Sequence, residues 1–578
     1  MDRSGLMFAR RKFLSFWASL GVAGTTFPGL LWAEMEKRGE LTVASLQAAE
    51  KLAGLEFTDD ERQLMLDGLE DLRNDYETLR TVALDNSISP ALRFDPEMAG
   101  AEARRHRPAP RAWSPPKIER PADDDGLAFL TAAELGALIQ RRQISSEELT
   151  IFYLERLRRF DPQLHCVITL TEERALAAAR RADRELGQGK WRGPLHGVPW
   201  GAKDLLSVKG YPTTWGAKPF VDQVIDEDAT VVTRLDKAGA VLVAKLTLGA
   251  LAWGDVWFGG KTRNPWNTEQ GSSGSSAGPA SATAAGLVGF SIGSETWGSI
   301  VSPSTRCGVS GLRPTFGRVS RHGAMALSWS MDKLGPMCRS VEDCGLVMGA
   351  IHGADGLDPT TVDRPYASST GLDLRSLRFG YLRSDFGREL EFDDDDDESA
   401  RQRAQEWRKH DLESVETLRS LGVELIPLEL PDIPVGALSF ILSAEAAAAF
   451  DELTRSGGDD LLVRQIENAW PNVFRQARTI PAVEYIQANR VRTVLMQEME
   501  KLLAGFDGWL APSFAGDNLL LTNLTGHPSV VLPNGFCSDG TPTSFTVNGR
   551  LFGETEILAV AHAYQTATGF HRRRPGGF

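Results

Sequence analysis

The segment from Ser273 to Ser302 constrains the fold of this 578-residue chain more than any other, and reads SGSSAGPASATAAGLVGFSIGSETWGSIVS. It holds eight serines, and almost all of its other residues are small or apolar. Small residues let backbone pack closely against backbone or a ligand. A flexible linker is also rich in small residues, but the stretch AAGLVGFSIG is typical of a buried helix or strand. Serine hydroxyls and main-chain N–H groups must therefore carry any chemistry in this segment.

About seventy residues upstream, the stretch PLHGVPWGAKD holds one lysine, Lys203, among apolar and glycine residues. Burial in such surroundings favours the neutral amine, because desolvation penalises the ammonium ion. A serine hydroxyl becomes a useful nucleophile only when a base lies within hydrogen-bond reach. Lys203 and the serine-rich segment together thus indicate nucleophilic catalysis by serine.

Both segments resemble the motifs of the amidase signature family. GSETWGS at residues 293–299 is similar to the family's GSDTGGS block, and SGSSAG at 273–278 is similar to its first serine block. Further similarity at 262–266, 307–323, 330–337 and 561–569 extends the resemblance over residues 127 to 575. The first 125 residues lie outside it.

The resemblance implies which residues are catalytic. Ser299 falls on the family's nucleophile, Ser275 on its proton-relaying serine, and Lys203 on its base. The resemblance also implies an oxyanion hole formed by the N–H groups of four consecutive residues, Thr296, Trp297, Gly298 and Ser299. The candidates for contact with the substrate are Trp253, Gly274 and Trp297.

The expected fold is α/β, with a mixed central sheet of about eleven strands covered by helices and a helical N-terminal extension. The expected reaction is hydrolysis of a carboxamide C–N bond through an acyl-enzyme on Ser299. Trp297 stands where the family often has glycine, and Val301 stands where it often has arginine, which favours apolar or aryl amides. An esterase, a carbamate hydrolase or a cyclic-amide hydrolase would use the same residues. A glutamine-dependent amidotransferase A-type subunit is the less favoured alternative.

Composition narrows the choice of partners. The 63 basic and 77 acidic side chains give a net charge of −14, which argues against a nucleic-acid partner. Five scattered cysteines and nine histidines show no metal-ligand spacing, so neither a metal nor another cofactor is expected. The expected partner is a small-molecule amide, and the sequence leaves open whether the chain forms a homodimer.

The N-terminus predicts export. Arg10 and Arg11 precede a moderately apolar stretch, residues 16–33, which resembles a twin-arginine signal over residues 1–33. The sequence thus predicts a periplasmic or secreted protein, with an uncleaved anchor as the alternative and no membrane span in the mature chain. Residues 34–125 are expected to form the helical extension and a proline-rich linker, and 126–578 the catalytic domain.

Overall fold

The computed structural model describes residues 41–53, 55–79, 81–82, 94–97, 113–367, 372–390, 392 and 397–578. The export signal expected over residues 1–33 lies outside them. The chain divides into two compact units. The first combines the described residues before 92 with residues 433–494, and the second comprises the described residues of 93–432 and 495–578.

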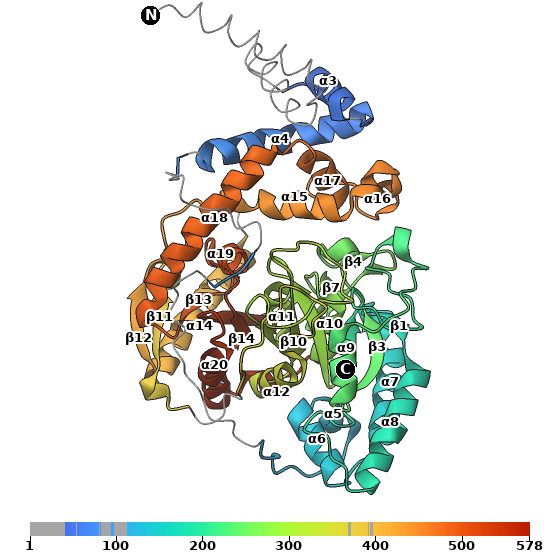
Figure 1. Ribbon diagram of the computed structural model, residues 1–578. Coiled ribbons are helices and arrows are strands. Elements are labelled where there is room, and N and C mark those ends of the chain that lie inside the picture. Colours follow the sequence, from blue (N-terminus) through green and yellow to red (C-terminus); the bar gives the residue numbers. More distant parts are fainter. Residues whose placement is uncertain are drawn as a thin grey trace, which may run out of the picture. The chain divides into compact units, whose positions relative to one another are not determined.

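An eleven-stranded mixed sheet forms the centre of the second unit, in the order β1-β3-β2-β8-β10-β9-β14-β15-β13-β11-β12 (Figure 1). Strand β2 pairs in parallel with β3 and β8, and β11 pairs in parallel with β12 and β13; the other pairs are antiparallel. The predicted mixed α/β sheet is confirmed. Its strands are β1 Val167–Leu170, β2 Pro199–Lys203, β3 Val241–Leu246, β8 Phe290–Glu295, β9 Ser310–Arg313, β10 Lys333–Cys338, β11 Arg378–Leu382, β12 Glu424–Leu428, β13 Gly508–Pro512, β14 Ser529–Phe536 and β15 Pro542–Gly549.

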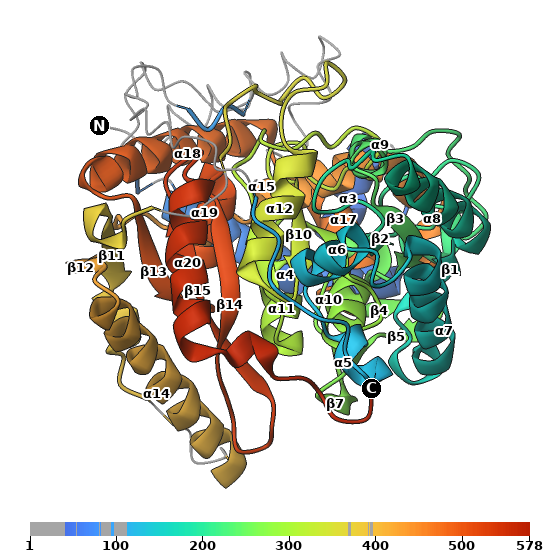
Figure 2. The same cartoon turned by 90° about the horizontal axis from the view of Figure 1, so that it is seen from below.

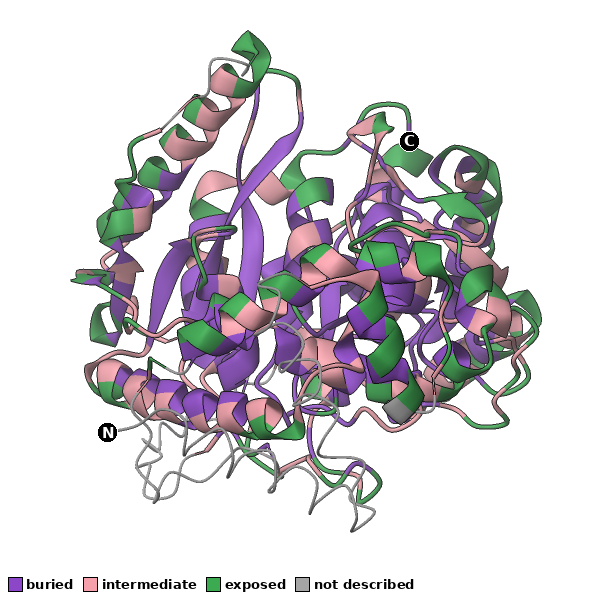
Figure 3. Ribbon diagram, turned by 90° about the horizontal axis from the view of Figure 1, so that it is seen from above, coloured by how far each residue is buried: buried purple, intermediate pink, exposed green. Residues whose placement is uncertain are grey.

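The strands in the middle of this sheet are buried along their whole length, as Figure 3 shows. Strands covered on both faces are typically continuous apolar or small-residue runs, which VLVAKL in β3 illustrates. Two two-stranded ribbons lie outside the main sheet: β4 Val256–Trp257 with β5 Gly260–Lys261, and β6 Arg263–Asn264 with β7 Asn267–Gly271.

Helices cover the sheet, and α12 and α20 lie side by side on its central strands (Figure 2). Thr131 and Ser145 cap α6 and α7 as their sequence motifs predict, each accepting a hydrogen bond from the backbone of the glutamate three residues on. The helices of this unit are α5 Asp124–Ala128, α6 Ala132–Gln140, α7 Ser146–Leu164, α8 Glu172–Gly187, α9 Thr230–Lys237, α10 Ala277–Ala284, α11 Val301–Cys307, α12 Val341–Ile351, α13 Arg383–Phe386, α14 Glu398–Ser420, α19 Asn518–Thr525 and α20 Glu554–Thr568, with 3-10 helices at Lys218–Phe220, Ala250–Ala252, Leu374–Ser376, Leu503–Gly505 and Phe570–Arg572.

The first unit is helical in all its regular structure that is described. It comprises α3 Val43–Ala53, α4 Asp59–Leu79, α15 Phe440–Ala449, α16 Asp451–Arg455, α17 Trp470–Ala477, most of α18 Ala482–Leu502, and 3-10 helices at Gly436–Leu438 and Gly458–Leu461. Helix α4 packs on α17, where Asn472 donates to the carbonyl of Leu64 at 2.9 Å and Arg475 pairs with Glu61 at 2.7 Å.

The helical character of the N-terminal extension is thus confirmed. The structure adds that this extension packs with residues 433–494, a grouping that a linear division into extension and catalytic domain does not contain. The physical reason is that α4 carries a further buried side chain, Tyr76, whose ring contacts the ring of Phe440 edge-on at 5.3 Å between centroids. The boundaries at residues 33 and 125 stay predictions. Among the helices described, none is long and apolar enough to cross a bilayer.

Candidate active site

Lys203 is the last residue of β2, and its side chain is fully buried. Its Nζ lies 2.8 Å from Ser275 Oγ, 3.0 Å from Ser276 Oγ and 2.9 Å from Ser294 Oγ. Burial lowers the pKa of Lys203 well below its usual value, although the more remote carboxylates of Asp332 and Glu295 act in the opposite direction. The amine therefore has the surroundings that a neutral base requires.

The serine loop reaches Lys203 because glycine lets two backbone segments touch. A Cβ on Gly274 would lie 1.8 Å from the carbonyl oxygen of Gly254, so no side chain fits there. The Gly274–Ser275 peptide bond is cis. Helix α10, built of small residues that are all buried, follows this loop directly. The structure thus brings together Lys203 and Ser275, which are far apart in the sequence.

The hydroxyl of Ser276 restricts how the amine can hydrogen-bond. Ser276 Oγ donates to the carbonyl of Ser294 at 3.0 Å and accepts from the N–H of Ser294 at 3.1 Å. Its proton is already used, so it can only accept from Lys203. A neutral amine that donates to Ser276 and Ser294 keeps its lone pair for the Ser275 hydroxyl. This arrangement allows Ser275 to hand a proton to Lys203.

Ser299 lies in the loop between β8 and α11 and is 8% exposed. Its carbonyl accepts a hydrogen bond from the N–H of Ser276 at 3.2 Å, which joins this loop to the serine loop. Gly298, with φ of +84°, adopts a left-handed conformation that favours glycine. The N–H groups of residues 296–299 donate to no acceptor in the described part of the chain, so they are available to a substrate oxygen.

Glu295 holds this loop in place. Its buried carboxylate accepts from the N–H groups of Ile300 at 2.8 Å and Val301 at 2.9 Å, at the start of α11. It also pairs with Arg313 at 2.6 Å and accepts from Asn523 at 2.8 Å. Burial alone would raise the pKa of Glu295, but Arg313 and these hydrogen bonds lower it to about 2. An ionised Glu295 supports the loop and does not transfer protons.

The three candidate substrate residues, Trp253, Gly274 and Trp297, differ in their position and exposure. Trp253 precedes Gly254, the residue whose carbonyl meets Gly274, so both lie at the serine loop. Trp297 is 45% exposed.

A cavity of about 380 Å³ is lined by Thr296 and by Ser294, whose Oγ contacts the Lys203 amine. Lys203, Ser275 and Ser299 are not among its lining residues. Trp253, Gly274 and Trp297 are not among its lining residues. Most of its wall comes from residues 321–334 and 357–360, which the sequence motifs did not single out as substrate contacts. One signal was present: the apolar stretch AMAL at 324–327 lies between two of the blocks that carry the family resemblance.

A protein-family model described as Amidase matches residues 148–521, which is more than half of the chain. The chain belongs to the amidase signature family. It is an amidase-signature hydrolase, and this family acts on C–N bonds. The match covers all three residues expected to be catalytic.

Curated relatives agree with this assignment. The chain is 34% identical over 494 residues to a protein from Moorella thermoacetica that is named as the A subunit of glutamyl-tRNA(Gln) amidotransferase, covering 78% of this chain and 99% of the relative. A protein of the same name from Methylococcus capsulatus is also 34% identical, over 493 residues, with 77% and 99% covered.

Solved structures show the same fold. The peptide amidase from Stenotrophomonas maltophilia superposes with a TM-score of 0.65 at 30% identity, covering 78% of this chain and 98% of that one. A bacterial aryl acylamidase of the amidase signature family superposes with a TM-score of 0.65 at 22% identity, covering 77% and 97%. The second likeness concerns the fold alone.

Proposed function

We propose that the protein hydrolyses carboxamide bonds through an acyl-enzyme on Ser299, with Ser275 and Lys203 as the proton relay. The observation that carries this proposal is the 2.8 Å contact between the buried Lys203 amine and Ser275 Oγ. A buried lysine without a facing carboxylate at hydrogen-bond distance is costly to keep as ammonium, and its neutral form is the base that serine needs.

The proposed reaction has two halves, acylation of Ser299 and hydrolysis of the acyl-enzyme. Lys203 takes the proton of Ser275 as Ser275 takes that of Ser299, and the Ser299 oxygen attacks the carbonyl carbon. The N–H groups of residues 296–299 stabilise the oxyanion of the tetrahedral intermediate. The relay then returns the proton to the nitrogen, the C–N bond breaks and the amine leaves. Water, deprotonated by the same relay, hydrolyses the acyl-enzyme to the acid and regenerates Ser299.

We further propose apolar or aryl amides as substrates. Esters, carbamates and cyclic amides share the chemistry and remain the alternatives within this mechanism. A second candidate is the amide of glutamine, because the curated relatives above carry the name of a glutamyl-tRNA amidotransferase component. A higher kcat/KM for free glutamine than for aryl and alkyl amides would favour that second candidate.

The decisive experiment combines mutation with covalent labelling. Ser299→Ala should lose amide hydrolysis and labelling by a fluorophosphonate, with an unchanged Tm. Ser302→Ala, in the following helix, is the matched control and should retain both. Ser299→Ala with more than a few per cent of the parent activity, or a label mapped by mass spectrometry to another serine, would refute Ser299 as nucleophile.

We propose, separately, that residues 1–33 direct export by a twin-arginine pathway. The support is the pair Arg10–Arg11 before the apolar stretch. A reporter fused to residues 1–40 should reach the periplasm, and replacing both arginines by lysine should stop it. Export that persists in cells without the twin-arginine translocase would contradict this location.

A further inference from the structure

The cavity of about 380 Å³ that Ser294 and Thr296 line has mostly apolar walls. Its size lies near the lower end of the range of small-molecule pockets, about 300–1,000 Å³, so it suits one substituent of a substrate. One lining residue, Ser294, is a hydrogen-bond partner of Lys203. Another, Thr296, belongs to the loop that ends at Ser299. The apolar residues of the wall are Leu205, Ala252, Ala324, Met325, Ala326, Leu327, Trp329, Leu334, Leu357 and Pro359.

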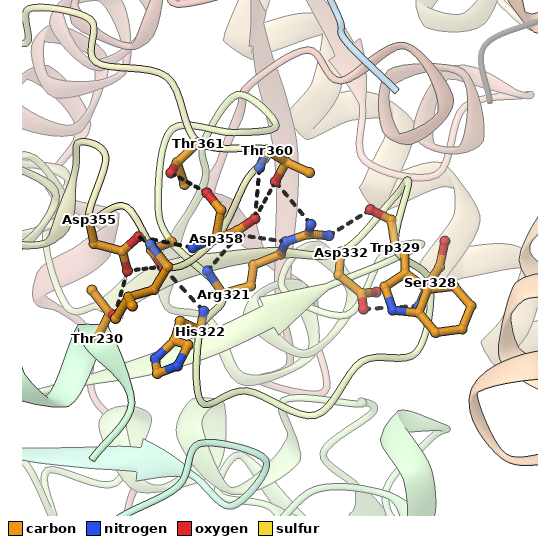
Figure 4. A network of polar contacts seen from close by, with 12 residues as sticks. Thr230, Arg321, His322, Ser328, Trp329, Asp332, Asp355, Asp358, Thr360 and Thr361 are labelled. Atoms are coloured by element: carbon orange, nitrogen blue, oxygen red, sulfur yellow. Dashed lines mark hydrogen bonds and ion pairs between the residues drawn. The ribbon is translucent and has the colours of Figure 1, made fainter. Parts of the chain in front are cut away.

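The positive charge in the lining is already compensated. Arg321 pairs with Asp358 at 3.1 Å, and it also donates to the carbonyl of Trp329 at 2.8 Å and to Thr360 Oγ1 at 2.9 Å (Figure 4). The guanidinium therefore holds the wall segment that ends at Trp329 against residues 358–360. An anionic group entering the pocket would compete with Asp358 for this cation.

The negative charge in the lining is satisfied in the same way. Asp332 accepts from the N–H groups of Leu327 at 2.8 Å and Ser328 at 2.9 Å, and from Thr296 Oγ1 at 2.6 Å. This one carboxylate thus ties the wall of the pocket to the loop of the proposed oxyanion hole. Burial raises the pKa of Asp332, and the hydrogen bond from Thr296 opposes that shift.

We propose that this pocket binds a neutral, apolar group of the substrate, an aryl ring or a medium-length alkyl chain, and that residues 324–329 are its specificity-determining wall. The inference rests on the proposed hydrolase function. A charged group would lie beside Arg321, which is already paired with Asp358, and Asp332, which already accepts three hydrogen bonds, so its burial costs free energy. An apolar group gains from burial against the ten apolar residues of the wall.

The test uses two series of amides, one with the acyl group lengthened from acetyl to octanoyl and one with the amine enlarged from methylamine to naphthylamine. In the parent, kcat/KM should rise with size in the series whose variable group occupies the pocket. Ala326→Phe fills the pocket. In that series it should lower the preference for size, which is kcat/KM of the largest substrate divided by kcat/KM of the smallest, by about tenfold or more. Leu327→Ala should shift the optimum toward larger groups.

Ala404→Phe is the matched control, because Ala404 is half-buried in α14 and is not among the lining residues of this pocket. Ala404→Phe should leave the large-to-small ratio of kcat/KM unchanged in both the acyl series and the amine series. The inference would be overturned if kcat/KM rose with substituent size in neither series. It would also be overturned if Ala326→Phe lowered kcat/KM equally for large and small substrates. If a fluorophosphonate labels Ser299 in the parent but kcat/KM shows no size preference, only the pocket inference is refuted. If the parent is not labelled at Ser299, the proposed hydrolase function is refuted as well.

Discussion

Replacing Lys203 by methionine should change how the stability of the protein depends on pH. Methionine has a similar length and no charge, so the variant cannot exchange a proton at this position. In the parent, Lys203 is neutral in the fold at a pH above its lowered pKa, but it is protonated in the unfolded chain below about pH 10.4. Between these two values the unfolded state binds one proton more than the native state.

The sign and size of the effect follow directly. Where the unfolded state binds more protons, stability rises with pH, by about 1.4 kcal/mol per unit for one proton. The parent should therefore gain stability relative to Lys203→Met with rising pH wherever the pH exceeds the lowered pKa of Lys203, by at most ~2.7 kcal/mol between pH 7 and pH 9. Contributions of the other titrating groups are common to both proteins and cancel in the difference.

The assay is equilibrium urea unfolding of both proteins at pH 7, 8 and 9. Lys501→Met serves as the control, since the Lys501 side chain is 71% exposed and its replacement should give parallel curves. A difference between parent and Lys203→Met that stays constant from pH 7 to pH 9 would show that Lys203 keeps its proton in the fold. It could not then be the base for Ser299.

Other perturbations test neighbouring parts of the site. Lys203→Ala should reduce hydrolysis of an amide by about 10²–10⁴-fold, and of a matched aryl ester far less, because a phenoxide leaves without a proton; equal losses would exclude leaving-group protonation by Lys203. Glu295→Gln should lower the free energy of unfolding by about 3–5 kcal/mol in urea, because Arg313 is left buried and unpaired; a loss below ~1 kcal/mol would contradict this role. Activity should persist in EDTA, and a loss that a divalent ion restores would reveal a metal requirement.

The resemblance to the amidase signature family implied that Lys203 and Ser275 act together, and their side chains lie 2.8 Å apart. The sequence could not predict which hydrogen bonds surround the Lys203 amine. Ser276 and Ser294 also surround the amine, and their role depends on which atom each hydroxyl donates to, a property of the folded backbone. The supporting role of Glu295 depends on Arg313, which comes from β9, outside the motif that holds Glu295.

The pocket wall was missed for a different reason. Its lining comes from positions as distant as Leu205, Ala252, Leu327 and Leu357, which share no periodicity and meet only through tertiary packing. Similarly, the apolar face of α4 predicts a helix that needs a partner, but it does not say that α17 supplies it. Local patterns identify elements and motifs, while the partners of each face depend on the whole chain.

A second buried lysine shows what distinguishes Lys203. Lys245 lies on β3, the neighbour of β2, and its side chain is also fully buried. Its Nζ meets the Asp204 carboxylate at 2.6 Å, the carbonyl of Pro212 at 2.6 Å and Thr213 Oγ1 at 2.6 Å. Burial lowers the pKa of Lys245, but Asp204 opposes that shift directly.

Lys203 has hydroxyls and one carbonyl around its amine and, in the described part of the chain, no carboxylate at hydrogen-bond distance. The two lysines lie on adjacent strands and are both fully buried, but the partners of their amines differ. A carboxylate at 2.6 Å stabilises the ammonium form of Lys245, which makes it a poor base. Hydroxyl partners accept from either form of the amine, so no described partner at hydrogen-bond distance opposes the lowering of the Lys203 pKa by burial. The basicity of the Lys203 amine therefore depends on two features of its surroundings: the nearby serine hydroxyls, and the lack of a described carboxylate such as the one that contacts Lys245.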